Sequence, residues 1–267
     1  MTAPAATHLG RIVEAHRRAA AADTRSVDAL IDAAKAQPAP RGFAAGLRAA
    51  HKPAIIAEIK RRSPVKGNLR VDLDAAQVGR AYQAGGAACL SVLTDDESFG
   101  GSADDLRTAR AATSLPVLRK DFTVSAADVC DARLMGADAV LLIVAALDDV
   151  ELGAFRTLAV EVGLDALVEV HDEAELERAL AVGADLVGVN QRDLATFHVD
   201  RGRAARLSKA IPPGVTLVGE SGIRDAADVA ALLDAGVHAV LVGETLVTAD
   251  DPTVAVKSLR QASKPDG

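Results

Sequence analysis

Aromatic side chains and cysteines are scarce in this chain. Aromatic residues make up 2% of the 267 positions, and tryptophan is absent. Because proteins that bind single-stranded nucleic acid stack the bases on aromatic side chains, this scarcity argues against that function. The two cysteines, Cys89 and Cys130, are too far apart for a disulfide framework or a metal-binding cluster. We expect both thiols to be buried.

Long apolar runs are also missing. None approaches the length of a membrane span, and the N-terminus lacks the charged-then-apolar pattern of a signal peptide. We therefore expect a cytoplasmic protein that contacts no membrane. The net charge of −7 disfavours nucleic acid as a partner, although a local cluster of cations could still hold a small phosphate.

What the chain does contain is a repeat built on aliphatic residues. Hydrophobic residues make up 49% of the sequence. A short motif recurs in which a predicted helix ends at a glycine and an apolar run follows. The glycines are Gly86, Gly136, Gly183 and Gly236, and a looser copy has Gly163. A glycine suits a helix end because it can adopt the left-handed conformation there. Continuous apolar runs are typical of parallel strands covered on both faces.

The repeat extends to eight strand–helix units. We predict strands near 54–60, 89–94, 116–120, 139–143, 165–170, 186–190, 216–220 and 239–242. We predict helices near 74–85, 103–112, 125–135, 148–162, 172–182, 201–210, 225–235 and 252–262, with N-caps that include Ser125, Asp172 and Asp225. This regular alternation predicts an α/β fold, a single (β/α)8 TIM barrel over residues 51–262. An open, doubly wound parallel sheet is the alternative, and the even spacing makes it the weaker one.

The first fifty residues lie outside the repeat. Apolar stripes at Leu9, Ile12 and Val13 and again at Val27, Leu30 and Ile31 predict two helices, and Ser26 is a plausible cap for the second. Prolines then interrupt the pattern. We expect residues 1–50 to form an N-terminal helical extension packed on the barrel, not a separate domain.

Charged and polar residues gather where the predicted strands end. In a parallel barrel these ends meet on one rim, which is the location of the active site. Because buried charges are costly unless they are paired, so many charges on one rim indicate a ligand site. After the last two strands, Ser221-Gly222 and Gly243-Glu244 stand where barrels commonly bind phosphate through backbone N–H groups. The other candidates are Glu58, Lys60, Lys120, Glu169, Asn190, Arg192 and Glu220.

Six motifs in order resemble the indole-3-glycerol phosphate synthases, from about Pro53 to Pro252. They read AEIKRRSP (57–64), SVLTD with FGG (91–95 and 99–101), LRKDF (118–122), LVEVH (167–171), GVNQRDL (188–194) and GESGI (219–223). The resemblance implies a tryptophan-pathway enzyme that acts on 1-(2-carboxyphenylamino)-1-deoxyribulose 5-phosphate. Such an enzyme closes the indole ring with loss of carbon dioxide and water. No metal or organic cofactor is implied.

The resemblance also implies roles for individual residues. Lys120 matches the general acid, and we expect Lys60 as a nearby cation to make Lys120 release its proton more readily. Glu169 matches the carboxylate that accepts a proton later, although it could instead only hold Lys120. Glu58 would orient the lysines, and Lys60 would contact the substrate's carboxylate or phosphate. Asn190, Arg192 and Glu220 would hold polar groups of the substrate and each other.

The remaining matches concern binding. The phosphate set is Ser63, Ser221, Gly222 and Gly243, with Glu244 able to contribute only its backbone because some members of the family have serine there. The apolar walls for the anthranilate ring would be Phe99, Phe122 and Leu194. His171 and His198 have no partner at metal-ligand spacing, so we expect them to be solvated or to cap helices.

Two other functions fit parts of the pattern. A phosphoribosylanthranilate isomerase would also bind an anthranilate-linked sugar phosphate, but its proton shift would need a Cys or Asp base on an early strand. A degenerate barrel that only binds a phosphosugar would have lost an acid or a base, and this chain has kept both. We expect a monomer whose partner is a small phosphorylated molecule.

Overall fold

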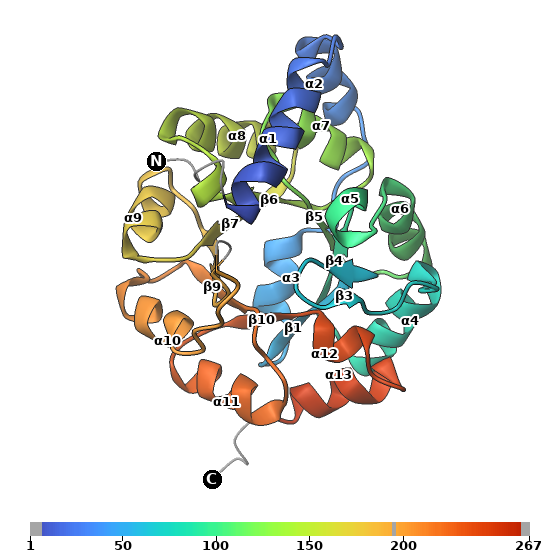
Figure 1. Cartoon of the computed structure of the whole chain (residues 1–267), viewed down its shortest axis with the longest axis vertical. Helices are drawn as coiled ribbons and strands as arrows, with labels where there is room; N and C mark the ends of the chain where they lie inside the picture. The colour runs from blue at the N-terminus through green and yellow to red at the C-terminus, as the bar shows by residue number, and fades with distance from the viewer. Residues whose placement is uncertain (1–6, 194–195, 263–267) are drawn as a thin grey trace.

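Eight parallel strands close into a barrel in the computed structural model, which describes residues 7–193 and 196–262 (Figure 1). The closing strand β1 pairs with both β10 and β4, so the sheet has no edge. The predicted barrel is therefore confirmed, and the open sheet is wrong. In hydrogen-bonded order the strands are β1 (Ala54–Ile59), β10 (Ala239–Val242), β9 (Thr216–Glu220), β8 (Leu186–Asn190), β7 (Asp165–Val170), β6 (Ala139–Ile143), β5 (Val117–Lys120) and β4 (Cys89–Leu93).

Helices cover the outside of the barrel at nearly the predicted positions. Ser125, Asp172 and Asp225 each accept a backbone hydrogen bond as N-caps, as predicted. The segment predicted as one helix over 201–210 is instead a short helix followed by a 3-10 turn (Ser208–Ala210). The outer helices are α4 (Ala75–Gly85), α6 (Ala103–Ala112), α7 (Ala126–Leu134), α8 (Asp149–Glu161), α9 (Glu173–Ala181), α10 (Arg203–Leu207), α11 (Ala226–Asp234) and α13 (Pro252–Arg260).

The barrel wall is buried almost throughout. Every residue of β4, β6, β8, β9 and β10 is buried, as expected for strands enclosed by side chains inside and helices outside. Cys89 and Cys130 are buried free thiols, as predicted. The charged exceptions in this apolar wall include Glu58, Glu169 and Glu220, all at strand ends. The core therefore fixes the positions of these carboxylates.

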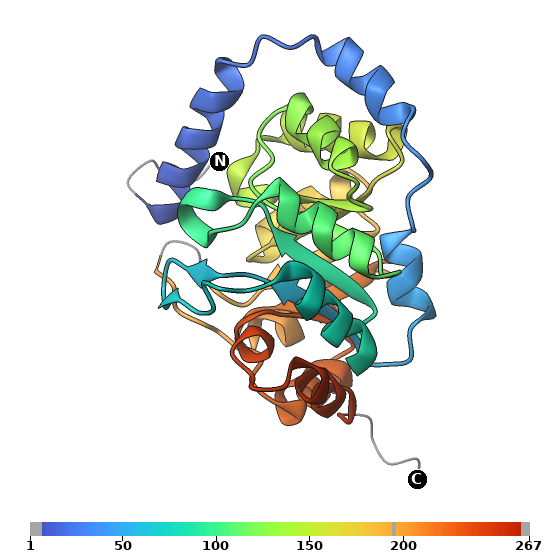
Figure 2. The same ribbon diagram turned by 90° about the vertical axis from the view of Figure 1, so that its right-hand side faces the viewer.

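The N-terminal segment arches along one side of the barrel (Figure 2). The predicted helices are α1 (His8–Ala21), which lies by the mouth of the barrel, and α2 (Val27–Lys35), which packs against α7. A third helix, α3 (Phe43–Ala49), lies at the opposite end and was not predicted. The Ala44 N–H donates to Asp165 at the start of β7 (2.8 Å), and the Phe43 side chain is fully buried. The segment thus contacts both ends of the barrel.

Several short elements at the mouth of the barrel were also not predicted. They are the hairpin β2 (Arg62–Ser63) and β3 (Gly67–Asn68), the helical turns α5 (Asp96–Phe99) and α12 (Glu244–Val247), and the 3-10 turn η1 (Val144–Ala146). Each follows a strand, so these loops border the site. Over the described parts of the chain, we find no helix with the length and apolar character needed to cross a membrane.

Candidate active site

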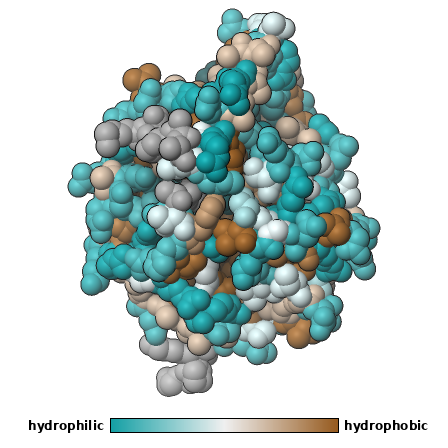
Figure 3. All heavy atoms as spheres, in the orientation of Figure 1, coloured by the Kyte–Doolittle hydropathy of each residue, from teal (hydrophilic) through white to brown (hydrophobic). Residues whose placement is uncertain are grey.

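A cavity of about 440 Å³ opens at the C-terminal ends of the strands and receives side chains from all eight of them. Its size falls in the range of small-molecule pockets. On this face, hydrophilic residues surround a small group of apolar ones near the middle (Figure 3). The cavity is lined by Glu58, Lys60, Ser63, Phe99, Lys120, Phe122, Glu169, Asn190, Arg192, Glu220, Ser221, Gly222, Gly243 and Glu244, which are the predicted site residues. The remaining one, Leu194, lies outside the described residues.

Glu58 and Lys60 form an ion pair at the end of β1. Their Oε1 and Nζ atoms are 2.5 Å apart, because residues two apart on a strand face the same side. The end of β10 lies against this pair. A Cβ atom at Gly243 would stand 2.3 Å from Oε1 of Glu58 and 3.0 Å from Nζ of Lys60, so any larger residue there would have to displace the ends of these two side chains.

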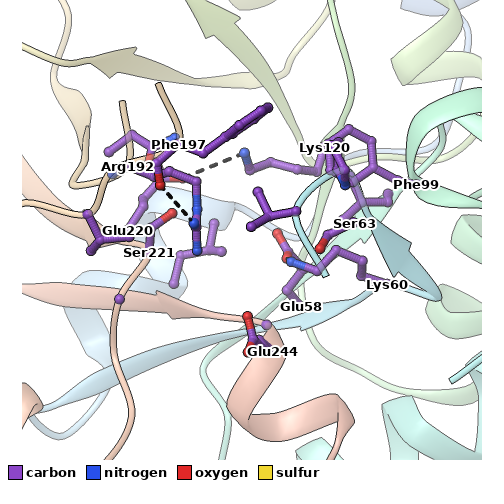
Figure 4. Close-up of a pocket in the computed structure, with 18 of the residues that line it drawn as sticks. Glu58, Lys60, Ser63, Phe99, Lys120, Arg192, Phe197, Glu220, Ser221 and Glu244 are labelled. Carbon is purple, nitrogen blue, oxygen red and sulfur yellow. Dashed lines mark hydrogen bonds and ion pairs between the residues drawn. The ribbon is translucent and has the colours of Figure 1, made fainter. Parts of the chain in front are cut away.

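Lys120 extends across the cavity from β5 toward the side that holds Glu220 and Ser221 (Figure 4). Its Nζ lies 3.2 Å from Oε2 of Glu169 and 3.6 Å from Oε2 of Glu220. Burial lowers the pKa of Lys120, but the charges of Glu169, Glu220 and Glu58 outweigh it and leave the pKa above the ordinary lysine value. The expectation that Lys60 would make Lys120 more acidic is therefore wrong, because the ammonium group lies next to Glu169 and Glu220.

Glu169 is held on both of its oxygens. Oε2 faces Lys120, and Oε1 accepts a hydrogen bond from Asn190 Nδ2 at 3.2 Å. Burial raises the pKa of this carboxyl, whereas the charges of Lys120 and His171 and the hydrogen bonds lower it more strongly. The net pKa lies below the ordinary glutamate value, so Glu169 is ionised at neutral pH although its side chain is only 1% exposed.

The pKa of Glu220 is shifted in the opposite direction, upward. Burial, together with the nearby charges of Glu169 and Glu58, raises its pKa to about 8, and Lys120 only partly opposes this. Among the described residues, its Oε1 has no hydrogen-bond partner. Of the two carboxyl groups next to the Lys120 ammonium group, Glu169 is therefore ionised at neutral pH whereas Glu220 is largely protonated.

The loop after β9 has an unusual backbone. Ser221 and Gly222 adopt φ angles of 65° and 73°, and Ser221 is one of two non-glycine residues in the described chain with a positive φ. A Cβ atom at position 222 would stand 2.5 Å from Cγ1 of Val199. From behind, Gln191 Nε2 donates to the Ser221 carbonyl at 2.9 Å. Position 222 therefore has no room for a Cβ atom, and the Gln191 side chain anchors the loop.

Two cationic side chains near this loop, Lys66 and Arg201, have different partners. Lys66 in the β2–β3 hairpin pairs with Glu244 at 3.4 Å. This ion pair partly offsets the negative charge that Glu244 brings to the predicted phosphate end. Arg201 Nε donates to the Gly222 carbonyl at 3.1 Å. Arg201 and Lys66 line the cavity but were not predicted, since neither ends a strand.

The other side of the cavity is apolar. The rings of Phe99 and Phe122 lie 6.4 Å apart, tilted by 32°. Phe197, which was not predicted, also lines the cavity and meets His8 edge-on at 5.2 Å. It comes from the loop after β8 and has a φ of 61°. Nothing in the local sequence pattern marks such a residue as part of a site.

The N-terminal helix α1 contributes to the mouth through His8, Leu9 and Ile12. His16 on the same helix lies 3.1 Å from Asp95, which ties α1 to the loop after β4. The stripe of apolar residues that predicted this helix thus faces the cavity in part. Its position over the mouth depends on tertiary contacts that the sequence pattern does not specify.

Known proteins resemble this chain along most of its length. The sequence profile of the indole-3-glycerol phosphate synthase family matches residues 9–259. The chain is 53% identical over 230 residues to indole-3-glycerol phosphate synthase 2 of Streptomyces coelicolor, covering 86% of this chain and 89% of that protein. It is 48% identical over 256 residues to the indole-3-glycerol phosphate synthase of Mycolicibacterium vanbaalenii, covering 95% and 94%.

Solved structures show the same fold at low sequence identity. A 3-hexulose-6-phosphate synthase matches with a TM-score of 0.63 and 20% identity, over 78% of this chain and 99% of the other. A thiamine phosphate pyrophosphorylase from Pyrococcus furiosus matches with a TM-score of 0.60 and 17% identity, over 79% and 94%. At this level of identity the two structures show that the barrel fold is shared, and nothing more. This chain belongs to the indole-3-glycerol phosphate synthase family.

Proposed function

We propose that this enzyme converts 1-(2-carboxyphenylamino)-1-deoxyribulose 5-phosphate into indole-3-glycerol phosphate, carbon dioxide and water. The observation that carries the proposal is the Lys120–Glu169 pair, which stands within one cavity between an apolar wall and a glycine-containing loop. The substrate has the matching order of parts: an aromatic ring, a ketone in the middle and a phosphate at the end.

The phosphate would bind at the ends of β9 and β10. Backbone N–H groups of the Ser221-Gly222 loop and of Gly243 would donate to its oxygens, because anions bind well where the backbone can come close. Lys60 would supply the cation. The anthranilate ring would lie against Phe99 and Phe122.

Lys120 would protonate the ketone oxygen. The aromatic carbon that bears the carboxylate then attacks the ketone carbon and forms the new carbon–carbon bond. Loss of carbon dioxide restores the aromatic ring. A raised pKa keeps Lys120 protonated at neutral pH, so the proton is in place when the substrate binds.

Glu169 would act in the dehydration. The hydroxyl group formed in the first step takes up a proton from solvent and leaves as water, and the neighbouring ring carbon must lose a proton to complete the indole. An ionised carboxylate can accept that proton, and the lowered pKa of Glu169 favours the ionised form. Glu58 would orient Lys60 and oppose positive charge that develops on the substrate.

The chain would act as a monomer, since one copy lines the cavity from all eight strands. Absorbance or fluorescence of the indole product, measured with purified protein and no added metal, tests the reaction directly. Prompt product formation is the expected result. Tight binding of the reduced, unreactive substrate analogue without turnover would instead indicate a binding protein, and the absence of both would contradict the proposed substrate.

A further inference from the structure

His171 lies directly behind the proposed proton acceptor. It follows β7, two residues after Glu169, and does not line the cavity. Only 12% of its side chain is exposed, so the expectation of a solvated histidine is wrong. The ring lies against Glu169, and because Glu169 lines the cavity whereas His171 does not, it contacts this carboxylate from outside the cavity.

Glu175, in the first turn of α9, fixes the orientation of this ring. Its Oε2 accepts two hydrogen bonds from residue 171, one from the backbone N–H at 2.7 Å and one from the ring Nδ1 at 2.9 Å. A carboxylate can only accept, so Nδ1 carries a hydrogen. The other ring nitrogen, Nε2, therefore faces Glu169.

The distance from Nε2 of His171 to Oε1 of Glu169 is 3.6 Å. Nε2 is buried and makes no hydrogen bond within the described chain. A neutral ring with its hydrogen on Nδ1 would direct a lone pair at the carboxylate of Glu169, which is unfavourable. An imidazolium ring instead directs an N–H group at it. The geometry therefore favours a charged imidazole next to an ionised Glu169.

We propose that His171 is a positioning residue that acts through Glu169: as an imidazolium held by Glu175, it keeps the Glu169 carboxylate ionised and oriented for proton acceptance. This inference rests on the proposed function for the role of Glu169. Three contacts then surround that carboxylate, namely Lys120, Asn190 and His171.

The charges around the ring support this assignment. Burial lowers the pKa of His171 and Arg203 on α10 adds a smaller lowering effect, but Glu175 and Glu169 outweigh both and raise the pKa above 6.5. The other charged groups nearby are Lys120, which contacts Glu169, and Glu220, whose pKa the charge of His171 lowers. The coupling is mutual, because an imidazolium lowers the pKa of the carboxylate by as much as the carboxylate raises that of the imidazole.

An NMR titration of the six histidines tests the coupling without any need for turnover. His171→Gln assigns the signal by its disappearance, and Glu169→Gln removes the facing charge. We expect the pKa of His171 to fall by about one unit or more in Glu169→Gln, as for the loss of an opposite charge at this distance. An unchanged pKa would overturn the proposal, whether or not the enzyme turns over the proposed substrate.

The pH dependence of kcat supplies the second test. His171→Gln keeps a donor but loses the charge, so the pKa of Glu169 should rise and the acidic limb should move up by about one pH unit, with KM changed less than about twofold. Glu175→Gln should shift the limb in the same direction by less. Glu177→Gln, an exposed change on the same helix, is the matched control and should match the wild type.

The results of these experiments distinguish a failure of the His171 proposal from a failure of the proposed reaction. A kcat lowered equally at all pH values in His171→Gln, with the limb unmoved, would show a merely structural role and overturn the proposal while leaving the reaction intact. An inactive wild-type enzyme would contradict the proposed function. The NMR titration would still decide whether His171 and Glu169 are coupled.

Discussion

The Nζ of Lys120 lies 3.2 Å from Oε2 of Glu169, although the two residues are 49 positions apart in the sequence. The barrel creates this contact by bringing the ends of β5 and β7 to one rim. A proposed acid and a proposed base thereby share one electrostatic environment, in which each favours the charged form of the other. Any change at one of them is expected to affect the other.

Removal of the proposed acid should abolish catalysis with little effect on binding. Lys120→Ala is expected to lower kcat by at least about two orders of magnitude, the usual contribution of a general acid. The reduced substrate analogue should bind within a few-fold of wild type, because Lys120 acts in the transition state. Lys209→Ala, an exposed lysine outside the cavity, is the control. Wild-type turnover in Lys120→Ala would exclude the role.

A negative charge at the start of the β9 loop should repel the phosphate. Ser221→Asp is expected to weaken analogue binding by about tenfold or more, whereas Ser221→Asn should weaken it much less. Asp and Asn both tolerate the left-handed backbone observed at Ser221, so the pair differs mainly in charge. Calorimetry gives both dissociation constants. Equal affinities of the two variants would place the phosphate elsewhere.

A methyl group at Gly243 should displace the Glu58–Lys60 pair. The added Cβ would overlap Glu58 Oε1 and crowd Lys60 Nζ, so Gly243→Ala is expected to lower kcat/KM by about tenfold or more. Gly153→Ala on α8 is the matched control, because its Cβ would meet only Val182 at an ordinary 3.7 Å. Steady-state kinetics compares the two. Full activity in Gly243→Ala would mean that the pair tolerates movement.

The buried Glu220 should make the protein less stable as the pH rises. Its pKa of about 8 in the folded state exceeds the ordinary 4.5, so between these values the folded state holds a proton that the unfolded chain has released. The unfolding free energy therefore falls as pH rises through this window. Glu220→Gln lacks this group and should be more stable than wild type by several kcal/mol at pH 9.

Thermal or urea denaturation at several pH values tests whether the unfolding free energy falls as the pH rises. The advantage of Glu220→Gln should shrink as the pH falls and vanish below about 4.5, where wild-type Glu220 is protonated in both states. A stability difference that does not vary with pH would show that Glu220 has no raised pKa.

Local patterns in the sequence were sufficient to determine the barrel. Apolar runs, helix-ending glycines and N-caps such as Ser125 act over a few residues, so they can be recognised from the sequence alone. The same holds for most of the candidate site. In a closed parallel barrel all strands end on one rim, and the residues at those ends, such as Lys120 and Glu220, must therefore meet.

Only the tertiary structure decided which residues complete the site and how they are charged. His8, Phe197 and Arg201 reach the cavity from a helix and loops whose paths depend on packing. The raised pKa of Lys120 and the position of His171 behind Glu169 depend on distances between strands. Short-range patterns specify which elements form, whereas the energies of buried charges depend on neighbours that closure of the barrel brings together.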